Sequence, residues 1–175
     1  MMKLLASNTS PLVALSAARR LDLLPRLFDR VQIPSAVFRE IVTNGTGWVE
    51  AAQTQKAIAE SAWVETVAVP DSPRLKSLIA GLGHGEAEAI ALAIHSQSPV
   101  LLDDLEARKA ARGLGVVVLG SLGVVARSKH AGHVVAAKPI VSAMVAAGIY
   151  YSDELIERFL VELGEDWDGG KAPIS

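Results

Sequence analysis

The sequence has no cysteine, few aromatic residues and no large excess of charge of either sign. Phe, Trp and Tyr make up 5% of its 175 residues, and the formal net charge is −2. The lack of cysteine excludes disulfide bonds, thiol catalysis and thiolate metal sites. The scarcity of aromatics argues against a platform for base stacking, and the small net charge gives no global field that attracts nucleic acid. Any binding of RNA or DNA therefore depends on local basic patches.

Long hydrophobic runs are missing as well. No apolar run approaches the ~20 residues that a membrane helix needs, and the apolar stretch within residues 1–6 is too short for a signal peptide. We therefore expect a cytoplasmic protein that does not enter a membrane. Half of the residues are nevertheless hydrophobic, which excludes a disordered chain and predicts one domain with a substantial core. We expect this domain to cover residues 1–163, followed by a flexible tail over 164–175.

Short apolar runs alternate with helical patterns along the chain. The runs at 100–102 and 116–119 are continuous, which is typical of parallel strands buried on both faces. Within 86–95, apolar residues recur at helical spacing. The alternation predicts an α/β fold, a three-layer α/β/α domain with a central parallel sheet. The expected strands are 4–6, 31–33, 63–69, 100–102 and 116–119, and the expected helices are 11–19, 36–42, 50–60, 73–80, 86–95, 105–112, 122–129, 139–147 and 153–163.

Polar residues follow two of the expected strands. Asn8 comes after the first run, and Asp103 and Asp104 come after the run at 100–102. Ligands of open parallel sheets bind beyond the carboxyl ends of the strands. Two adjacent carboxylates are costly to hold together without a cation, and their hard oxygen atoms suit Mg²⁺ or Mn²⁺. The alternative is that one of the two aspartates caps the helix that follows.

Three glutamates on expected helices are further candidates. Glu40 lies beside the apolar stripe of its helix, as either an inward-facing acid or a residue at the edge of that stripe. Glu86 and Glu88 open the helix at 86–95, where acids also favour the first turn through the helix dipole. Glu86 lies four residues before Ile90, on the side that we expect to be buried, so we favour it over Glu88 as a metal ligand.

The order and spacing of these segments resemble the PIN-domain family. The resemblance covers about residues 4–160 and rests on LASNTSPLVAL (5–15), IPSAVFREI (33–41), GHGEAEAIALA (83–93), LLDDLEAR (101–108) and GSLGVV (120–125). It implies a compact fold whose acids gather at the strand ends and hold Mg²⁺ or Mn²⁺. It also implies a metal-dependent endoribonuclease that acts on single-stranded or structured RNA. Many members of the family serve as the toxin of a VapC-type pair with an antitoxin protein.

The resemblance also implies which residues form the site. The implied catalytic residues are Glu40, Glu86 and Asp104, and the implied metal ligands are Asn8, Glu40, Glu86, Asp103 and Asp104, with Glu88 as the near alternative to Glu86. The metal would activate a water molecule and stabilise charge on the phosphate, while one carboxylate orients or deprotonates that water.

Asn8 departs from the family pattern, which has an aspartate at this position. An amide oxygen can ligate a hard cation but adds no negative charge, so metal binding is weakened and catalysis reduced or abolished. A catalytically weak or inactive PIN-like domain that binds RNA or a partner protein is therefore the second interpretation. A receiver-like phosphoryl-transfer domain is a third, but such domains carry their key aspartate after the first strand, where this chain has Asn8.

Basic residues and aliphatic helices indicate partners. Arg108, Lys109 and Arg112 follow Asp104, where they either flank the acidic pocket and bind phosphates or form a solvated helix face. The aliphatic stretches at 21–28 and 140–145 offer more apolar surface than a monomer needs to expose, which predicts a homodimer.

Overall fold

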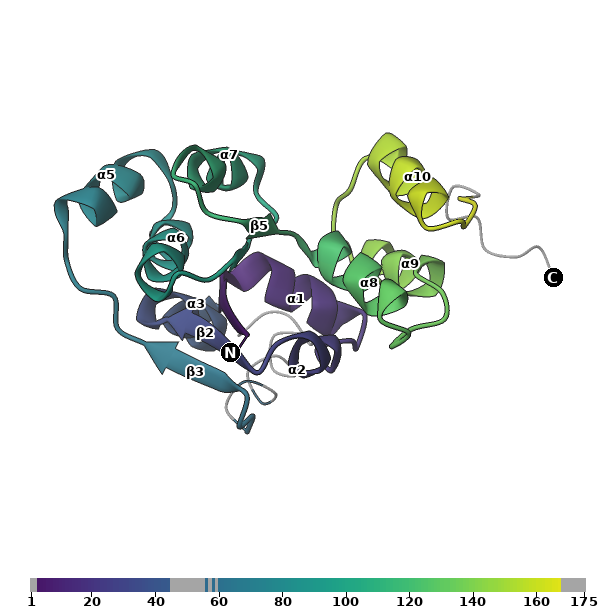
Figure 1. Ribbon diagram of the computed structural model, residues 1–175, viewed down its shortest axis with the longest axis horizontal. Helices are drawn as coiled ribbons and strands as arrows, with labels where there is room; N and C mark the ends of the chain where they lie inside the picture. Colours follow the sequence, from purple (N-terminus) through teal and green to yellow (C-terminus); the bar gives the residue numbers. More distant parts are fainter. Residues whose placement is uncertain (1–2, 45–55, 57, 59, 168–175) are drawn as a thin grey trace.

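A five-stranded, all-parallel sheet forms the centre of the molecule (Figure 1). The computed structural model describes residues 3–44, 56, 58 and 60–167. The strands are β1 (Leu4–Ser7), β2 (Arg30–Pro34), β3 (Val64–Val67), β4 (Val100–Leu101) and β5 (Val118–Leu119). Their order is β3-β2-β1-β4-β5, so the chain builds one half of the sheet outward from β1 and then returns to build the other half. Ligands of such sheets bind at this reversal, between the carboxyl ends of β1 and β4.

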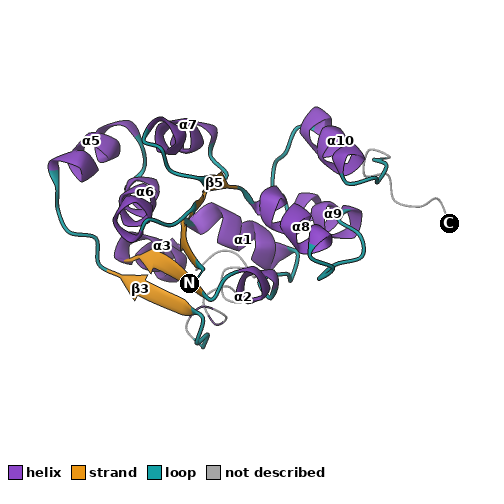
Figure 2. Cartoon of the chain, viewed as in Figure 1, coloured by secondary structure: helices purple, strands orange, loops and turns teal. Residues whose placement is uncertain are grey.

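Helices cover both faces of the sheet (Figure 2). Those of the described residues are α1 (Thr9–Ala17), α2 (Leu23–Leu27), α3 (Ser35–Asn44), α5 (Pro73–Gly81), α6 (His84–Ser96), α7 (Leu105–Gly113), α8 (Ser121–His130), α9 (Lys138–Ala146) and α10 (Asp153–Glu162). Leu5 and Leu101 pack into one hydrophobic cluster with α1, α2 and α8, whereas Ala6, Val100 and Leu102 pack into another with α6 and α7. Successive strand residues thus point to opposite faces. The predicted three-layer α/β/α fold with a central parallel sheet is confirmed.

Capping side chains set where individual helices begin. The Ser152 hydroxyl accepts a hydrogen bond of 3.2 Å from the Leu155 N–H and caps α10. The first helix begins at Thr9, two residues before the expected start at residue 11, and Asn8 occupies its N-cap position without a capping bond from its side chain. The strand end after β1 and the helix start of α1 therefore meet at one residue.

The remaining expectations differ from the structure mainly at their edges. The third strand is shorter than predicted, and the expected helix at 50–60 lies mostly outside the described residues, as does 168–175 of the expected tail. The domain boundary at 163 stays a prediction; just beyond it, the Glu165 carboxylate accepts hydrogen bonds of 2.7 and 2.8 Å from the Ala137 and Lys138 N–H groups at the start of α9. Across the described part of the chain, every helix is too short or too polar to span a bilayer.

Candidate functional site

Asn8 stands where the sheet reverses, directly after β1. The register pairs Ser7 with Leu101 of β4, and the Asn8 N–H donates a hydrogen bond of 3.2 Å to the Leu101 carbonyl. The side chain is only 5% exposed, and its Oδ1 has no hydrogen-bond partner within the described structure. Asparagine at an N-cap ordinarily bonds the first turn of its helix, but this side chain makes no such bond. A buried acceptor without a hydrogen-bond partner costs about 1–3 kcal/mol of stability. The position of the Asn8 side chain is therefore not explained by helix capping.

Glu40 reaches the same place from α3. The Thr9 hydroxyl donates a hydrogen bond of 2.6 Å to Glu40 Oε2, which holds this carboxylate beside the end of β1. Gly85, in the first turn of α6, closes the site from a third direction. A Cβ built on Gly85 would lie 2.7 and 2.9 Å from Glu40 Oε1 and Oε2 and 3.0 Å from Asn8 Oδ1. Three oxygen atoms from two chain segments therefore face the backbone of this glycine, and a side chain at position 85 would force the Glu40 carboxylate to move.

Asp103 lies at the end of β4 in a second group of polar side chains. Its Oδ1 accepts a hydrogen bond of 2.8 Å from the Ser121 N–H, at the start of α8. Burial raises the pKa of the Asp103 carboxyl, while the Ser121 N–H and hydroxyl and the positive charge of Arg108 oppose the rise. A Cβ built on Gly120 would lie 2.9 Å from Arg108 Nη1 and 3.1 Å from Asp103 Oδ1, so the guanidinium and the carboxylate approach the same point.

Tyr151 joins this second group from the segment between α9 and α10. Its hydroxyl lies 2.7 Å from the Ser121 hydroxyl and 3.7 Å from the sulfur of Met144. Burial and the negative charge of Asp103 raise the pKa of Tyr151 to about 12, so the phenol stays protonated at neutral pH. Ser121 thus bonds Asp103 through its N–H and Tyr151 through its hydroxyl, and it links the strand end to the C-terminal helices.

The structure places the other predicted site residues in different roles. Asp104 is exposed, and its Oδ1 accepts a hydrogen bond of 2.8 Å from the Ala107 N–H, so the capping alternative is confirmed for this residue. Glu86 turns back on its own helix and accepts a hydrogen bond of 3.0 Å from the Gly83 N–H. Glu88 instead accepts a hydrogen bond of 3.2 Å from the Ala36 N–H, at the start of the helix that carries Glu40.

The predicted ligand set is therefore brought together only in part. The structure joins Asn8 to Glu40 and places Asp103 at the neighbouring strand end, whereas Glu86 and Asp104 each complete a helix N-terminus. Among the described residues, no three acidic or histidine side chains are grouped so that they could hold a metal ion. The metal roles stay predictions. The donors present are nevertheless hard oxygens, one of them an orphaned buried amide, and this is the ligand chemistry of Mg²⁺ and Mn²⁺.

Two contributors to the site escaped the sequence analysis. Thr9 gives no signal because a threonine at a helix start is an ordinary finding. Tyr151 lies 30 residues from Ser121, and no periodicity connects the two. Gly85 directly precedes the expected helix at 86–95, and its signal is that a glycine lets other groups approach the backbone closely.

A family model described as a PIN domain matches residues 4–165 of the chain. A search of curated proteins finds nothing that matches.

Proposed function

Because the chain belongs to the PIN-domain family, we propose that it is a metal-dependent endoribonuclease whose activity is limited by the amide at Asn8. Proteins of this family are generally nucleases, and they typically bind Mg²⁺. The observation that carries the proposal is the convergence of Asn8 Oδ1 and the Glu40 carboxylate on Gly85, at the reversal of the sheet. A cation stabilises a carboxylate and an unpartnered amide oxygen that approach the same point.

Asn8, Glu40 and Asp103 are the residues that we propose as metal ligands. When bound, a divalent ion would lower the pKa of a water molecule and offset charge on the scissile phosphate. The hydrogen bond from Thr9 fixes one oxygen of Glu40, which leaves the other oxygen to accept a proton from the attacking water. Ser121 and Tyr151 hold Asp103 in position. One neutral amide and two carboxylates supply less negative charge than three carboxylates, which is why we expect weak metal binding.

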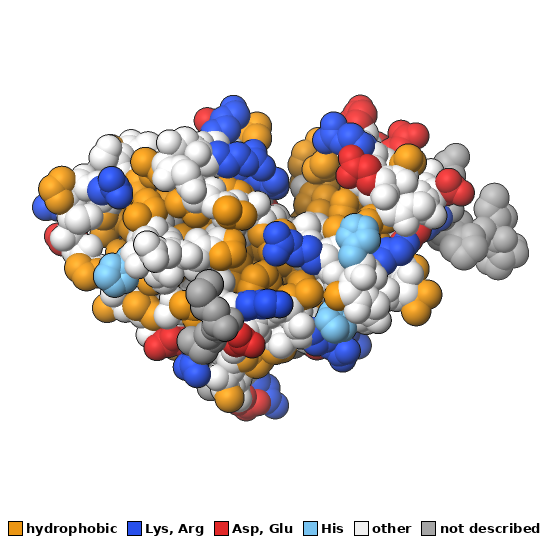
Figure 3. Space-filling view, in the orientation of Figure 1, with side chains coloured by type: hydrophobic (Ala, Val, Ile, Leu, Met, Phe, Trp, Pro, Cys, Tyr) orange, Lys and Arg blue, Asp and Glu red, His pale blue; other side chains and the backbone are white. Residues whose placement is uncertain are grey.

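Arg108 is the proposed contact for the substrate backbone. Its guanidinium lies next to Asp103 at Gly120, and Lys109 and Arg112 share its helix. Figure 3 shows Lys and Arg side chains over α7, beside a hollow whose other wall, over α10, carries Asp and Glu. Phosphate contacts of this kind bind RNA without reading its sequence. The role of a toxin with a cognate antitoxin is a narrower version of the same proposal, and a small antitoxin gene beside this one would support it.

The second candidate function is an RNA-binding or protein-binding domain with little activity. It is favoured by Asn8 and by the helix-capping roles of Glu86 and Asp104, which leave few carboxylates for a metal. The two candidates differ in what restoring the acid at position 8 does. In an active site limited by charge, Asn8→Asp raises the cleavage rate, whereas in a binding domain it has no effect on cleavage.

Cleavage of end-labelled single-stranded RNA tests the proposal. We would compare the wild type with Glu40→Gln and Asn8→Asp in Mn²⁺, Mg²⁺ and EDTA, and use Glu157→Gln, an exposed glutamate of α10, as the matched control. We expect slow, metal-dependent cleavage that Glu40→Gln lowers by about 100-fold, that Asn8→Asp increases and that Glu157→Gln leaves unchanged. Cleavage that survives EDTA or Glu40→Gln overturns the proposed site. A folded protein that stays inactive with Asp at position 8 supports the binding domain.

A further inference from the structure

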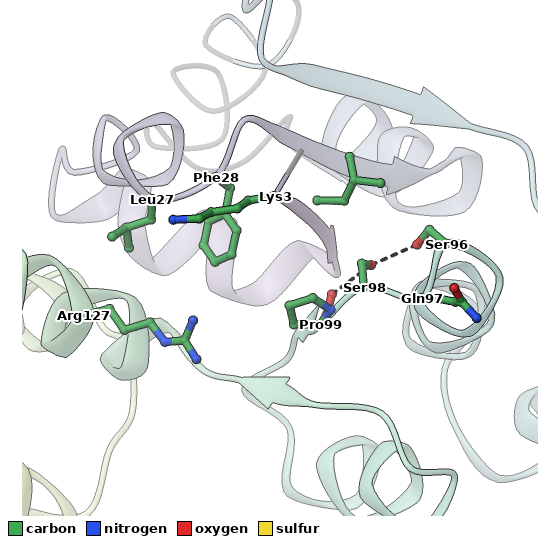
Figure 4. A pocket seen from close by; sticks show the side chains of 9 residues that line it. Lys3, Leu27, Phe28, Ser96, Gln97, Ser98, Pro99 and Arg127 are labelled. Atoms are coloured by element: carbon green, nitrogen blue, oxygen red, sulfur yellow. Dashed lines mark hydrogen bonds between the residues drawn. The ribbon is translucent and has the colours of Figure 1, made fainter. Parts of the chain in front are cut away.

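We propose that a second pocket, at the opposite end of the sheet, binds a nucleoside monophosphate, either free or as the phosphorylated end of an RNA strand. The pocket has a volume of about 560 Å³, which falls in the range of small-molecule sites. It opens at the amino ends of β1 and β4, whereas Asn8 and Asp103 follow their carboxyl ends. Its lining comes from the start of β1, α2, the end of α6 and α8, and it includes Lys3, Phe28, Ser96, Ser98 and Arg127 (Figure 4).

One end of the pocket is cationic. Lys3 precedes β1 and Arg127 belongs to α8, and Figure 4 shows them on the same side of the pocket as Leu27. Neither side chain forms an ion pair with another described residue, although several other basic residues do. None of the described lining residues is acidic; the Asp29 carboxylate, which bonds the Lys3 N–H at 2.6 Å, lies outside the lining. Two unpaired cations from separate segments suit a phosphate group, because a dianion can engage both.

The middle of the pocket is apolar. Leu4 and Pro99 contribute aliphatic surface, and Phe28, which is only 6% exposed, contributes a small part of its ring. Inorganic phosphate alone would leave this apolar surface in contact with water, so the lining favours a ligand with an apolar body beside its anionic group. A nucleobase has such a body and can pack on this surface.

The end formed by the last turn of α6 offers hydrogen-bond acceptors. The Ser96 hydroxyl lies 2.8 Å from the Leu92 carbonyl and 2.9 Å from the Ser98 hydroxyl, which is itself 3.2 Å from the Pro99 carbonyl. Each hydroxyl has one proton, and both protons are used within the protein. At least one lone pair on each hydroxyl oxygen therefore remains free to accept a hydrogen bond. These oxygens complement donors such as the amino group of a base or a ribose hydroxyl, and an alkyl carboxylate offers no such donor.

Binding measured without metal separates this proposal from the nuclease proposal. We would titrate the full chain in EDTA with AMP, GMP, CMP and UMP by calorimetry, with inorganic phosphate and unphosphorylated nucleosides as comparison ligands. The variants are Arg127→Gln and Lys3→Gln, with Arg158→Gln, an exposed arginine of α10, as the matched control and Glu40→Gln to mark the other site. We expect millimolar or tighter binding of at least one nucleotide, weakened about ten-fold or more by Arg127→Gln and unchanged by Arg158→Gln and Glu40→Gln.

Two further readouts locate the ligand and its source. Amide chemical shifts are expected to change at 96–98 on nucleotide addition and to stay constant at 7–9, which tests the location even if a variant unfolds. A short RNA with a 5′-phosphate should compete with the nucleotide if the pocket takes RNA ends, and the same RNA without the phosphate should not. The proposal would be overturned if none of the nucleotides saturated the protein, or if inorganic phosphate bound with the same affinity as the nucleotides. Nucleotide binding that Arg127→Gln leaves unchanged would overturn it as well.

Discussion

Replacing Asn8 by aspartate tests the closeness of Asn8 to Glu40 directly. Glu40 Oε1 and Asn8 Oδ1 lie 2.7 and 3.0 Å from the position that a Cβ would take on Gly85. The two oxygen atoms are therefore at most about 5.7 Å apart. Two negative charges at that separation repel by about 3 kcal/mol at an effective dielectric constant of ~20. Water around the half-buried Glu40 reduces this figure, so we expect Asn8→Asp to cost about 2 kcal/mol without metal, or about 4–8 °C in Tm.

The loss of stability caused by Asn8→Asp should depend on pH and on the presence of Mn²⁺. Repulsion raises the pKa of the carboxyl pair in the folded protein above that in the unfolded chain. The folded state then binds protons more tightly, so stability is retained at low pH and lost as pH rises through the raised pKa. Mn²⁺ neutralises the pair and should raise the Tm of Asn8→Asp more than that of the wild type.

Thermal unfolding in EDTA and in Mn²⁺, at pH 5 and pH 8, measures these effects. The double variant Asn8→Asp with Glu40→Gln is the control, because removing the second charge should abolish both the destabilisation and its pH dependence. The reasoning is refuted if the single and double variants unfold alike, since the two side chains would then not interact.

Three further predictions follow from neighbouring contacts. Gly85→Ala places a Cβ against the oxygens of Glu40 and Asn8; we expect a loss of about 1–3 kcal/mol in urea unfolding and weaker Mn²⁺ binding. Burial raises the pKa of Glu165, but hydrogen bonds from two α9 N–H groups and Lys129 outweigh it and leave the pKa lowered. Glu165→Gln should therefore cost about 1 kcal/mol at pH 7 and less as pH falls through the lowered pKa, as measured by urea unfolding. Asp103→Asn should lower the pKa of Tyr151 from about 12, seen as tyrosinate absorbance at lower pH.

Matched variants control these three experiments. Gly81→Ala is the control for position 85, because a Cβ there meets no atom within 4 Å, and it should be neutral or stabilising. Tyr150 is 88% exposed, so Tyr150→Phe isolates the signal of Tyr151 without disturbing it. The contacts described above would be contradicted if Gly85→Ala and Gly81→Ala had equal effects on stability. They would also be contradicted if Glu165→Gln still cost stability at low pH, or if Asp103→Asn left the pKa of the Tyr151 phenol unchanged.

The alternation of strands and helices could be predicted from the sequence, because the pattern of apolar residues that must be buried differs between the two. Continuous apolar runs such as 116–119 need helices on both faces, and the helices between them follow from apolar spacing and capping residues. Strand lengths could not be predicted in the same way. Only Val118–Leu119 of that run pairs, because its neighbour β4 consists of Val100–Leu101 alone.

The choice among acids could not be made from the sequence, because it depends on where each helix begins. Asp103 and Asp104 both follow the strand, but only Asp104 falls at the N-cap of α7. The position of Glu86 four residues before Ile90 favours it as a residue on the buried side of its helix. In the structure α6 begins at His84, and this start leaves the Glu86 carboxylate within reach of the Gly83 N–H. Two residues farther along, Glu88 faces α3 instead. Because α6 begins two residues before the expected start at 86, the Glu86 carboxylate bonds the N-terminus of its own helix.

Titration with Mn²⁺, followed by electron paramagnetic resonance, tests the central claim most directly, because it detects the metal without requiring turnover. We predict that the wild type binds Mn²⁺, that Glu40→Gln weakens the affinity about ten-fold or more, and that Asn8→Asp strengthens it. Equal affinity in the wild type and Glu40→Gln, with both proteins folded, would contradict a metal site built on Asn8 and Glu40.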